Sequence, residues 1–317
     1  MELNLSVIIP LFNEEESVKE LHQKIQDVID RHELGPYEIL FINDGSNDGS
    51  LDILKSIQLE DSNVRIISFL KNYGKAAALS VGFAECKGKY VVTMDADLQD
   101  DPEEIIRFIE LSKEKNLDLI SGWKKERRDP IEKKIPSKFF NFVTSTVGGI
   151  RLHDFNCGLK FYRQAVVKSL SHLVYGEMHR FIPLLAYWHG FAVGEMVVKH
   201  HPRKHGESKY GFARYLHGFM DLLTLALLNR YRTRPMHVFG LFGLLTFLVG
   251  ISINLYFLVV WIQTQTLHVR PIMLLGVIMM VVSLQFFSLG FISEMITQNN
   301  SKNTVYRFEE ITPPDGK

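Results

Sequence analysis

Short runs of β-branched and aromatic residues alternate with stretches of helical periodicity along the first 120 or so residues. Such runs, bounded by turn residues, are typical of buried strands. The pattern predicts strands at 5–10, 37–43, 64–69, 89–93 and 117–122, with helices at 15–32, 50–59, 76–85 and 103–114 between them. This β-α-β order with short turns predicts an α/β domain built on a mostly parallel sheet with right-handed crossovers.

The pattern changes after Pro235. Residues 236–262 and 272–293 contain no Asp, Glu, Lys or Arg, and each run exceeds the roughly 20 residues that a helix needs to cross a bilayer. Buried core helices are the alternative, but charge-free runs this long are rare in soluble domains. We therefore expect a transmembrane hairpin. The preceding segment, 211–231, spaces apolar residues like a helix lying in the membrane interface, although a helix packed on the sheet fits nearly as well.

Charge and cysteine content narrow the possibilities. The 317 residues carry no formal net charge, so nothing indicates nucleic acid as a partner. The two cysteines lack zinc-ligand spacing and cannot form a disulfide framework, which fits a reducing compartment. Basic residues flank both apolar runs, whereas the connecting segment carries only Arg270, so the positive-inside rule predicts a cytoplasmic catalytic domain. The flanking residues are Arg230, Arg232, Arg234, Lys302 and Arg307.

Candidate chemistry gathers where the predicted strands end. Asp95 and Asp97 directly follow the strand at 89–93, and Gln99 lies two residues further on. Ligands bind at the carboxyl ends of parallel strands, and oxygen ligands there suit a hard divalent cation that also takes phosphate oxygens. An acidic turn that begins the next helix is the alternative. Polar residues also follow the earlier strands, at 12–14, 44–46 and 72–75.

Two familiar phosphate-binding motifs are missing from the sequence. No G-x-G-x-x-G follows the first strand, which argues against a dehydrogenase, and no G-x-x-x-x-G-K-[ST] occurs, which argues against a P-loop NTPase. A nucleotide held by carboxylates and a metal ion is the remaining option.

The chain resembles the family 2 nucleotide-sugar glycosyltransferases, which have the Rossmann-like GT-A fold. The matching motifs are S-V-I-I-P-L-F-N-E-E at 6–15, F-I-N-D-G-S-N-D-G-S at 41–50 and M-D-A-D-L-Q-D-D-P at 94–102. Within that family it is similar to the polyprenyl-phosphate branch, through N-Y-G-K-A-A-A at 72–78, D-F-N-C-G-L-K at 154–160 and H-G-E-S-K-Y-G at 205–211. The resemblance covers about residues 1–300. Asn43 replaces the commoner acid, while Asp44 is retained.

The resemblance implies roles for individual residues. The base and ribose pocket would contain Pro10, Phe12, Glu14 and Asp44, with Lys75 near the nucleotide and Asp95 near the ribose. Asp97 and Gln99 would hold Mg²⁺ or Mn²⁺ against the diphosphate, where the cation acts as a Lewis acid on the leaving group.

The acceptor end needs cations that bind a lipid phosphate. The candidates are Arg127, Arg128, Lys133, Lys138, Arg203, Ser208 and Lys209. A solvated basic face or attraction to anionic lipids explains any single one equally well, and the motif match favours Ser208 and Lys209. Asp154, where the family has an active-site carboxylate, would orient the sugar or the acceptor. A phosphate monoester has a second pKa of about 6, so no general base is strictly required. The catalytic candidates are Asp97, Asp154 and Lys209.

The sequence thus predicts an inverting enzyme that moves a single sugar from a nucleotide sugar, with UDP-glucose expected from the resemblance, to undecaprenyl phosphate. A processive polysaccharide synthase would carry a Q-x-x-R-W element and more spans, neither of which occurs. A non-catalytic nucleotide-sugar sensor or scaffold is the third reading. Expected partners are the inner membrane, other copies in a homo-oligomer such as a tetramer, a separate flippase and a downstream transferase. The expected division is a catalytic domain at 1–210, an interfacial helix at 211–234, a hairpin at 235–296 and a tail at 297–317.

Overall fold

The computed structural model describes residues 3–125, 141, 144–146, 148–176, 178–202, 236–265 and 270–301. The chain divides into two compact units, Met1–Leu222 and Leu223–Lys317, and each is described by itself. The interfacial helix expected at 211–234 and the charged residues that flank the apolar runs on their outer sides lie outside the described residues.

The first unit is built on one seven-stranded sheet with the strand order β3-β2-β1-β4-β6-β5-β7. The strands β1–β4 are mutually parallel, β6 is antiparallel to both β4 and β5, and β7 is parallel to β5. The mostly parallel sheet is therefore confirmed, with one inserted antiparallel strand. Its strands are β1 (Leu5–Leu11), β2 (Tyr37–Asn43), β3 (Val64–Ser68), β4 (Tyr90–Thr93), β5 (Leu119–Trp123), β6 (Lys160–Arg163) and β7 (Val193–Val197).

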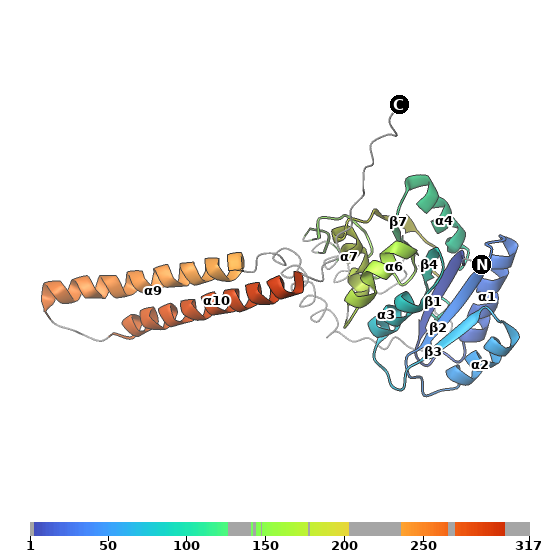
Figure 1. Ribbon diagram of the computed structural model, residues 1–317, viewed down its shortest axis with the longest axis horizontal. Helices are drawn as coiled ribbons and strands as arrows, with labels where there is room; N and C mark the ends of the chain where they lie inside the picture. The colour runs from blue at the N-terminus through green and yellow to red at the C-terminus, as the bar shows by residue number, and fades with distance from the viewer. Residues whose placement is uncertain are drawn as a thin grey trace, which may run out of the picture. The chain divides into compact units, whose positions relative to one another are not determined.

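Helices cover both faces of this sheet. Helices α1 and α2 lie on one side and α3 and α6 on the other (Figure 1). Alternate residues of β1 pack into the core beneath α1, α2 and α4, whereas Ile8 faces Gly82 of α3. The helical elements of this unit are α1 (Val18–Arg31), α2 (Ser50–Glu60), α3 (Lys75–Glu85), α4 (Glu104–Lys115), α6 (Gln164–Leu170), η1 (Ser171–Leu173), η2 (Met178–Phe181) and α7 (Ile182–Trp188).

Helix α1 begins three residues later than the sequence pattern predicts. The backbone carbonyl of Glu14 accepts the N–H groups of Ser17 and Val18 at 3.1 and 3.2 Å. The acidic residues around Glu14 therefore belong to the loop after β1, at the edge where the candidate site lies, and not to the helix.

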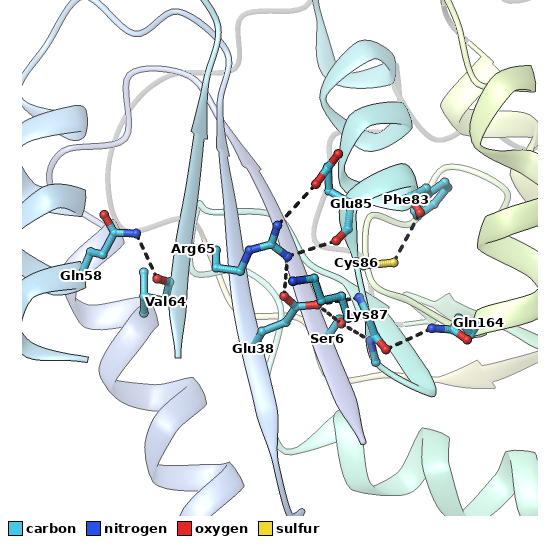
Figure 2. Close-up of polar contacts among 11 residues, drawn as sticks. Ser6, Glu38, Gln58, Val64, Arg65, Phe83, Glu85, Cys86, Lys87 and Gln164 are labelled. Carbon is cyan, nitrogen blue, oxygen red and sulfur yellow. Dashed lines mark hydrogen bonds and ion pairs between the residues drawn. The ribbon is translucent and has the colours of Figure 1, made fainter. Parts of the chain in front are cut away.

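A buried carboxylate fastens the opposite, amino edge of the sheet (Figure 2). Glu38 on β2 accepts hydrogen bonds from the Ser6 hydroxyl at 2.6 Å and the Lys87 N–H at 2.7 Å, and the Arg65 guanidinium pairs with it at 2.7 Å. Arg65 also donates to the carbonyl of Glu85 at 3.0 Å. The buried Glu38 carboxylate thus has hydrogen-bond donors on both of its oxygens. We infer that this cluster is structural and holds α3 against the sheet.

The second unit contains the helices α9 (Met236–Thr264) and α10 (Pro271–Ser301). Both are long and apolar enough to cross a membrane. Only 6 % and 11 % of their most apolar 18-residue stretches are buried. The two helices contact each other at small residues: a Cβ on Gly250 would lie 2.7 Å from the carbonyl oxygen of Gly276. Close approach of backbones at small residues is typical of helix packing in lipid. The amide of Asn254 donates to the Gly250 carbonyl at 2.9 Å.

Candidate active site

Two loops are joined at the carboxyl edge of the sheet, after β1 and after β2. The N–H of Asn13 donates to the Ser46 hydroxyl and the N–H of Glu14 to the Ser50 hydroxyl, both at 2.9 Å, while the N–H of Asn47 donates to the Asn13 side chain at 2.8 Å. Phe12 and Glu14 of the predicted base pocket therefore lie on a loop that is fixed against the Asp44 loop, and Pro10 lies in β1 just before this loop.

Asp44 is buried and holds the loop that precedes α3. One carboxylate oxygen accepts the N–H of Tyr73 at 2.7 Å and the other accepts the N–H of Gly74 at 2.9 Å. Burial raises the pKa of Asp44 above its usual value, and the two backbone hydrogen bonds act in the opposite direction without cancelling it. Gly45 lies so close to this loop, with φ of 68°, that a Cβ would be 2.4 Å from the Lys71 carbonyl carbon.

The first residue of α3 pairs with the first acid of the D-x-D motif. The Lys75 ammonium forms an ion pair with Asp95. Burial alone would raise the pKa of Asp95, but the positive charges of Lys75 and then Lys124 outweigh it and hold that pKa well below its usual range. On its other side Asp95 meets Gly158, where an added Cβ would lie 2.3 Å from a carboxylate oxygen. Only glycine therefore leaves Asp95 in this position.

The second acid lies on a tight turn. Asp97 is buried, and one of its oxygens accepts the N–H of Gln99 at 3.2 Å across Leu98, whose φ of 59° is unusual for a non-glycine residue. The described residues contain no group of three or more acidic, His or Cys side chains that could hold a metal ion alone. Two hard oxygen donors nonetheless suit Mg²⁺ or Mn²⁺, because such ions commonly take one or two protein ligands together with water and phosphate oxygens.

A largely buried ion pair lies next to this turn. Asp100 and Lys124 are 3.0 Å apart, with side-chain exposures of 0 % and 11 %. Burial would lower the pKa of Lys124, but the Asp100 charge raises it above its usual range. Asp100 lies in the motif at 94–102, whereas Lys124 lies in no quoted motif, and nothing in their spacing indicated that they pair.

Asp154 lies in the segment that leads into β6, and Lys160 is the first residue of that strand. Asp154 is buried and accepts the N–H of Asn156 at 3.0 Å, and Lys160 is buried and donates to the Cys157 carbonyl. Burial lowers the pKa of Lys160, partly offset by the nearby charges of Asp154 and Asp95. Lys160 thus lies within electrostatic range of two predicted site carboxylates. Lys160 is the last residue of the motif at 154–160, but nothing in the sequence indicated that its ammonium group is buried near these carboxylates.

Both cysteines of the chain are buried. Burial raises the pKa of Cys86 and of Cys157 to about 12, so neither thiol is ionised near neutral pH. Neither therefore fits the role of a nucleophile or a metal ligand.

The structure brings the nucleotide and metal candidates together along one edge, whereas the acceptor candidates fall outside the described residues. These are Arg127, Arg128, Lys133, Lys138, Arg203, Ser208 and Lys209. Their roles stay predictions.

Acidic and amide residues thus gather at the carboxyl edge of a mostly parallel α/β sheet, where α/β folds bind their ligands. The sequence profile of Glycosyl transferase family 2 matches residues 6–171. The chain therefore belongs to glycosyl transferase family 2, and it is a glycosyltransferase.

Its relatives act on polyprenyl phosphates. The chain is 36 % identical over 303 residues to the dodecaprenyl-phosphate galacturonate synthase of Rhizobium johnstonii, covering 93 % of this chain and 88 % of that protein. It is 33 % identical over 297 residues to the undecaprenyl-phosphate 4-deoxy-4-formamido-L-arabinose transferase of Pseudomonas fluorescens, covering 92 % and 84 %. The polyprenyl-phosphate sugar transferases are thus the part of the family to which it is similar.

Solved structures confirm the fold. Glucosyl-3-phosphoglycerate synthase from Mycobacterium tuberculosis, in complex with Mn²⁺, UDP and phosphoglyceric acid, superposes with a TM-score of 0.52 at 17 % identity, covering 72 % of this chain and 78 % of that one. S. aureus TarS in complex with UDP-GlcNAc gives 0.51 at 18 % identity, covering 72 % and 67 %. At these identities the likeness establishes the GT-A fold alone.

Proposed function

We propose that this protein transfers one sugar, with inversion, from a nucleotide sugar to a polyprenyl phosphate such as undecaprenyl phosphate at the cytoplasmic face of the inner membrane. The observation that carries the proposal is the turn after β4, where Asp95 pairs with Lys75 and the Gln99 N–H donates to the Asp97 carboxylate. The two long apolar helices fit an enzyme whose acceptor is a lipid.

The reaction needs little from the protein beyond placement of charge. A phosphate oxygen of the acceptor attacks the anomeric carbon, and the bond from that carbon to the nucleoside diphosphate breaks. Asp97 and Gln99 would hold Mg²⁺ or Mn²⁺, which supplies neutralisation of the departing diphosphate. Lys75 keeps Asp95 ionised, so that its carboxylate accepts hydrogen bonds from the ribose hydroxyls.

The acceptor phosphate is already largely dianionic near neutral pH, because its second pKa is about 6. Asp154 would therefore orient the donor sugar or the acceptor and not remove a proton. The acceptor phosphate would be bound through charge-assisted hydrogen bonds. The residues proposed to bind it are Ser208 and Lys209, together with Arg127, Arg128, Lys133, Lys138 and Arg203.

The sugar itself is the least constrained part of the proposal. UDP-glucose is the donor expected from the sequence, and the relatives' names add galacturonate and 4-deoxy-4-formamido-L-arabinose as candidates. Two spans offer little protein for moving the product across the bilayer, so a separate flippase and a downstream transferase would follow, and copies of the chain would assemble into a homo-oligomer such as a tetramer.

The test uses the purified full chain with undecaprenyl phosphate, Mn²⁺ and a panel of radiolabelled UDP-sugars that includes glucose and galacturonic acid. One labelled lipid carrying one sugar is expected, EDTA should abolish it, and Mg²⁺ or Mn²⁺ should restore it. Asp97→Ala should lower the rate on the order of 10²-fold or more. Asp52→Ala, an exposed change on α2, is the matched control and should stay within about twofold.

Three outcomes would contradict parts of the proposal. Full activity in EDTA would contradict the assignment of a metal ion to Asp97 and Gln99. A lengthening sugar polymer would favour a processive synthase. Tight binding of UDP-sugars without transfer to any polyprenyl phosphate would favour a sensor or scaffold.

A further inference from the structure

An exposed histidine at the carboxyl edge of the sheet is held in one orientation by residues of two strands. His153 directly precedes Asp154, and its imidazole stacks on the indole of Trp123, the last residue of β5, with ring centroids 4.0 Å apart and an interplanar angle of 11°. Glu195 of β7 accepts the His153 backbone N–H at 2.7 Å with one carboxylate oxygen and pairs with Nδ1 through the other. Both β4 and β5 are antiparallel to β6, so the stack lies at the same edge of the sheet as the turn that carries Asp97.

The contact with Glu195 decides which nitrogen of the His153 ring carries the proton. A carboxylate only accepts hydrogen bonds, so Nδ1 is the donor, and in the neutral imidazole Nε2 keeps its lone pair. Nε2 has no hydrogen-bond partner among the residues that the structure describes, and 61 % of the His153 side chain is exposed. Because the ring is already held by the stack and by Glu195, Nε2 is a pre-organised hydrogen-bond acceptor.

The next polar residues along the chain also offer acceptor atoms. Asp154 carries a buried carboxylate, and the Oδ1 atom of Asn156 is buried without a hydrogen-bond partner in the described part of the chain. A buried acceptor without a partner calls for a donor from a ligand or from water. Phosphate oxygens are acceptors only, whereas sugar hydroxyl groups also donate. Residues 153–156 therefore suit a sugar better than a phosphate.

We propose that Nε2 of His153 accepts a hydrogen bond from one hydroxyl group of the transferred sugar and so contributes to the choice of sugar, while Glu195 is a positioning residue that fixes the imidazole tautomer. The inference rests on the proposed function, because it needs a nucleotide-sugar donor whose sugar lies beside Asp154. A sugar that lacks this hydroxyl group leaves Nε2 without a donor when the sugar displaces water from it, and such a sugar is therefore disfavoured.

The test compares the sugar that the wild type transfers with its monodeoxy analogues. Each is supplied as the UDP-sugar to the full chain in detergent, with Mn²⁺ and undecaprenyl phosphate. At one deoxy position the wild type should lose about 3- to 10-fold in kcat/KM, the scale of one neutral hydrogen bond. His153→Phe keeps a ring against Trp123 but has no Nε2, so it should bring this ratio to within about twofold of one. Its affinity for UDP, which carries no sugar, should be unchanged.

Glu195→Gln tests the tautomer without removing the imidazole. The amide oxygen of the new side chain has to accept the backbone N–H of His153, which turns its NH₂ group toward Nδ1. Nδ1 then accepts and Nε2 carries the proton, so this variant should lose the same discrimination. It also serves if His153→Phe does not fold. His172→Phe, which replaces an exposed histidine of η1, is the matched control and should keep the wild-type ratios.

Three results would overturn the proposal. The first is a wild type that transfers a sugar but treats every monodeoxy analogue like the parent, within about twofold. The second is a His153→Phe or Glu195→Gln enzyme that keeps the wild-type ratio at every position. The third is a raised KM for undecaprenyl phosphate in His153→Phe with unchanged sugar ratios, because His153 would then contact the acceptor. Failure of the proposed function looks different, since the wild type would then transfer no sugar to undecaprenyl phosphate.

Discussion

A substitution at Gly158 directly tests how Asp95 is positioned in the candidate site. Its φ does not lie in the left-handed region, so the backbone accepts alanine, and the effect of Gly158→Ala comes from space alone. The new Cβ would lie 2.3 Å from a carboxylate oxygen of Asp95 and 2.5 Å from its Cγ, whereas ordinary contact begins at 3.4 Å. Asp95 must therefore move by about 1 Å or rotate away from Lys75.

The expected cost follows from that displacement. A misplacement of about 1 Å at a binding group lowers turnover by up to about 10²-fold, and overpacking lowers stability by about 1–3 kcal/mol. We expect Gly158→Ala to reduce kcat/KM for the donor by about 10- to 100-fold. The measurement is donor-dependent transfer to undecaprenyl phosphate, with UDP affinity by calorimetry and the melting temperature measured in parallel.

Gly82→Ala is the matched control for Gly158→Ala. It creates a similar overlap, with a Cβ 2.6 Å from Ile8, but inside the apolar core beneath α3. It should lower the melting temperature and leave the UDP affinity unchanged. Equal donor kinetics for Gly158→Ala and the wild type would refute the reasoning, because Asp95 would then have no part in binding the donor.

Three further predictions concern the acceptor, the topology and the amino edge. Asp154→Asn should slow transfer without moving the acidic limb of the pH–rate profile near pH 6; loss of that limb would make Asp154 a general base. An impermeant thiol reagent applied to intact cells should label Gln265→Cys and not Glu60→Cys. The reverse labelling would mean that the membrane orientation is opposite to the predicted one. The two native cysteines are buried and should give no background labelling. Glu38→Gln should cost about 1–3 kcal/mol in unfolding free energy while leaving UDP affinity unchanged, and a large change in that affinity would contradict its purely structural role.

Three strands of the parallel half of the fold, β1, β2 and β4, follow from the sequence because they are buried along nearly their whole length. β1 is buried at every position, so apart from Ser6 it appears in the sequence as an apolar run that ends where the polar loop begins. β6 and β7 lack that signal. β6 has four residues with Lys160 and Arg163 at its ends, and β7 is half-buried along most of its length. An antiparallel strand inserted beside β4 depends on contacts that no local pattern contains.

The candidate site likewise contains some residues whose positions the sequence predicted and others whose positions it did not. The position of Asp97 and Gln99 at a strand end could be predicted because they follow a clearly apolar run. Lys124 and Lys160 could not, because a single lysine in the sequence gives no sign of whether its ammonium group is solvated or buried against a carboxylate. Burial of both depends on the segment that returns to the sheet after Asp154, which is distant in the sequence from the D-x-D motif.

The residues predicted to bind the nucleotide lie near the carboxyl edge of the sheet. Hydrogen bonds and an ion pair also link them to one another. Asp44 holds the backbone of Tyr73 and Gly74, the next residue is Lys75, and Lys75 pairs with Asp95. Three strand ends are thereby joined through one loop, and Gly158 limits where the last carboxylate can lie. Asp44 therefore helps to fix the position of Lys75 in the candidate site. The effects of substituting Asp44, Lys75 and Asp95 should consequently be interdependent, because each sets the position of the next.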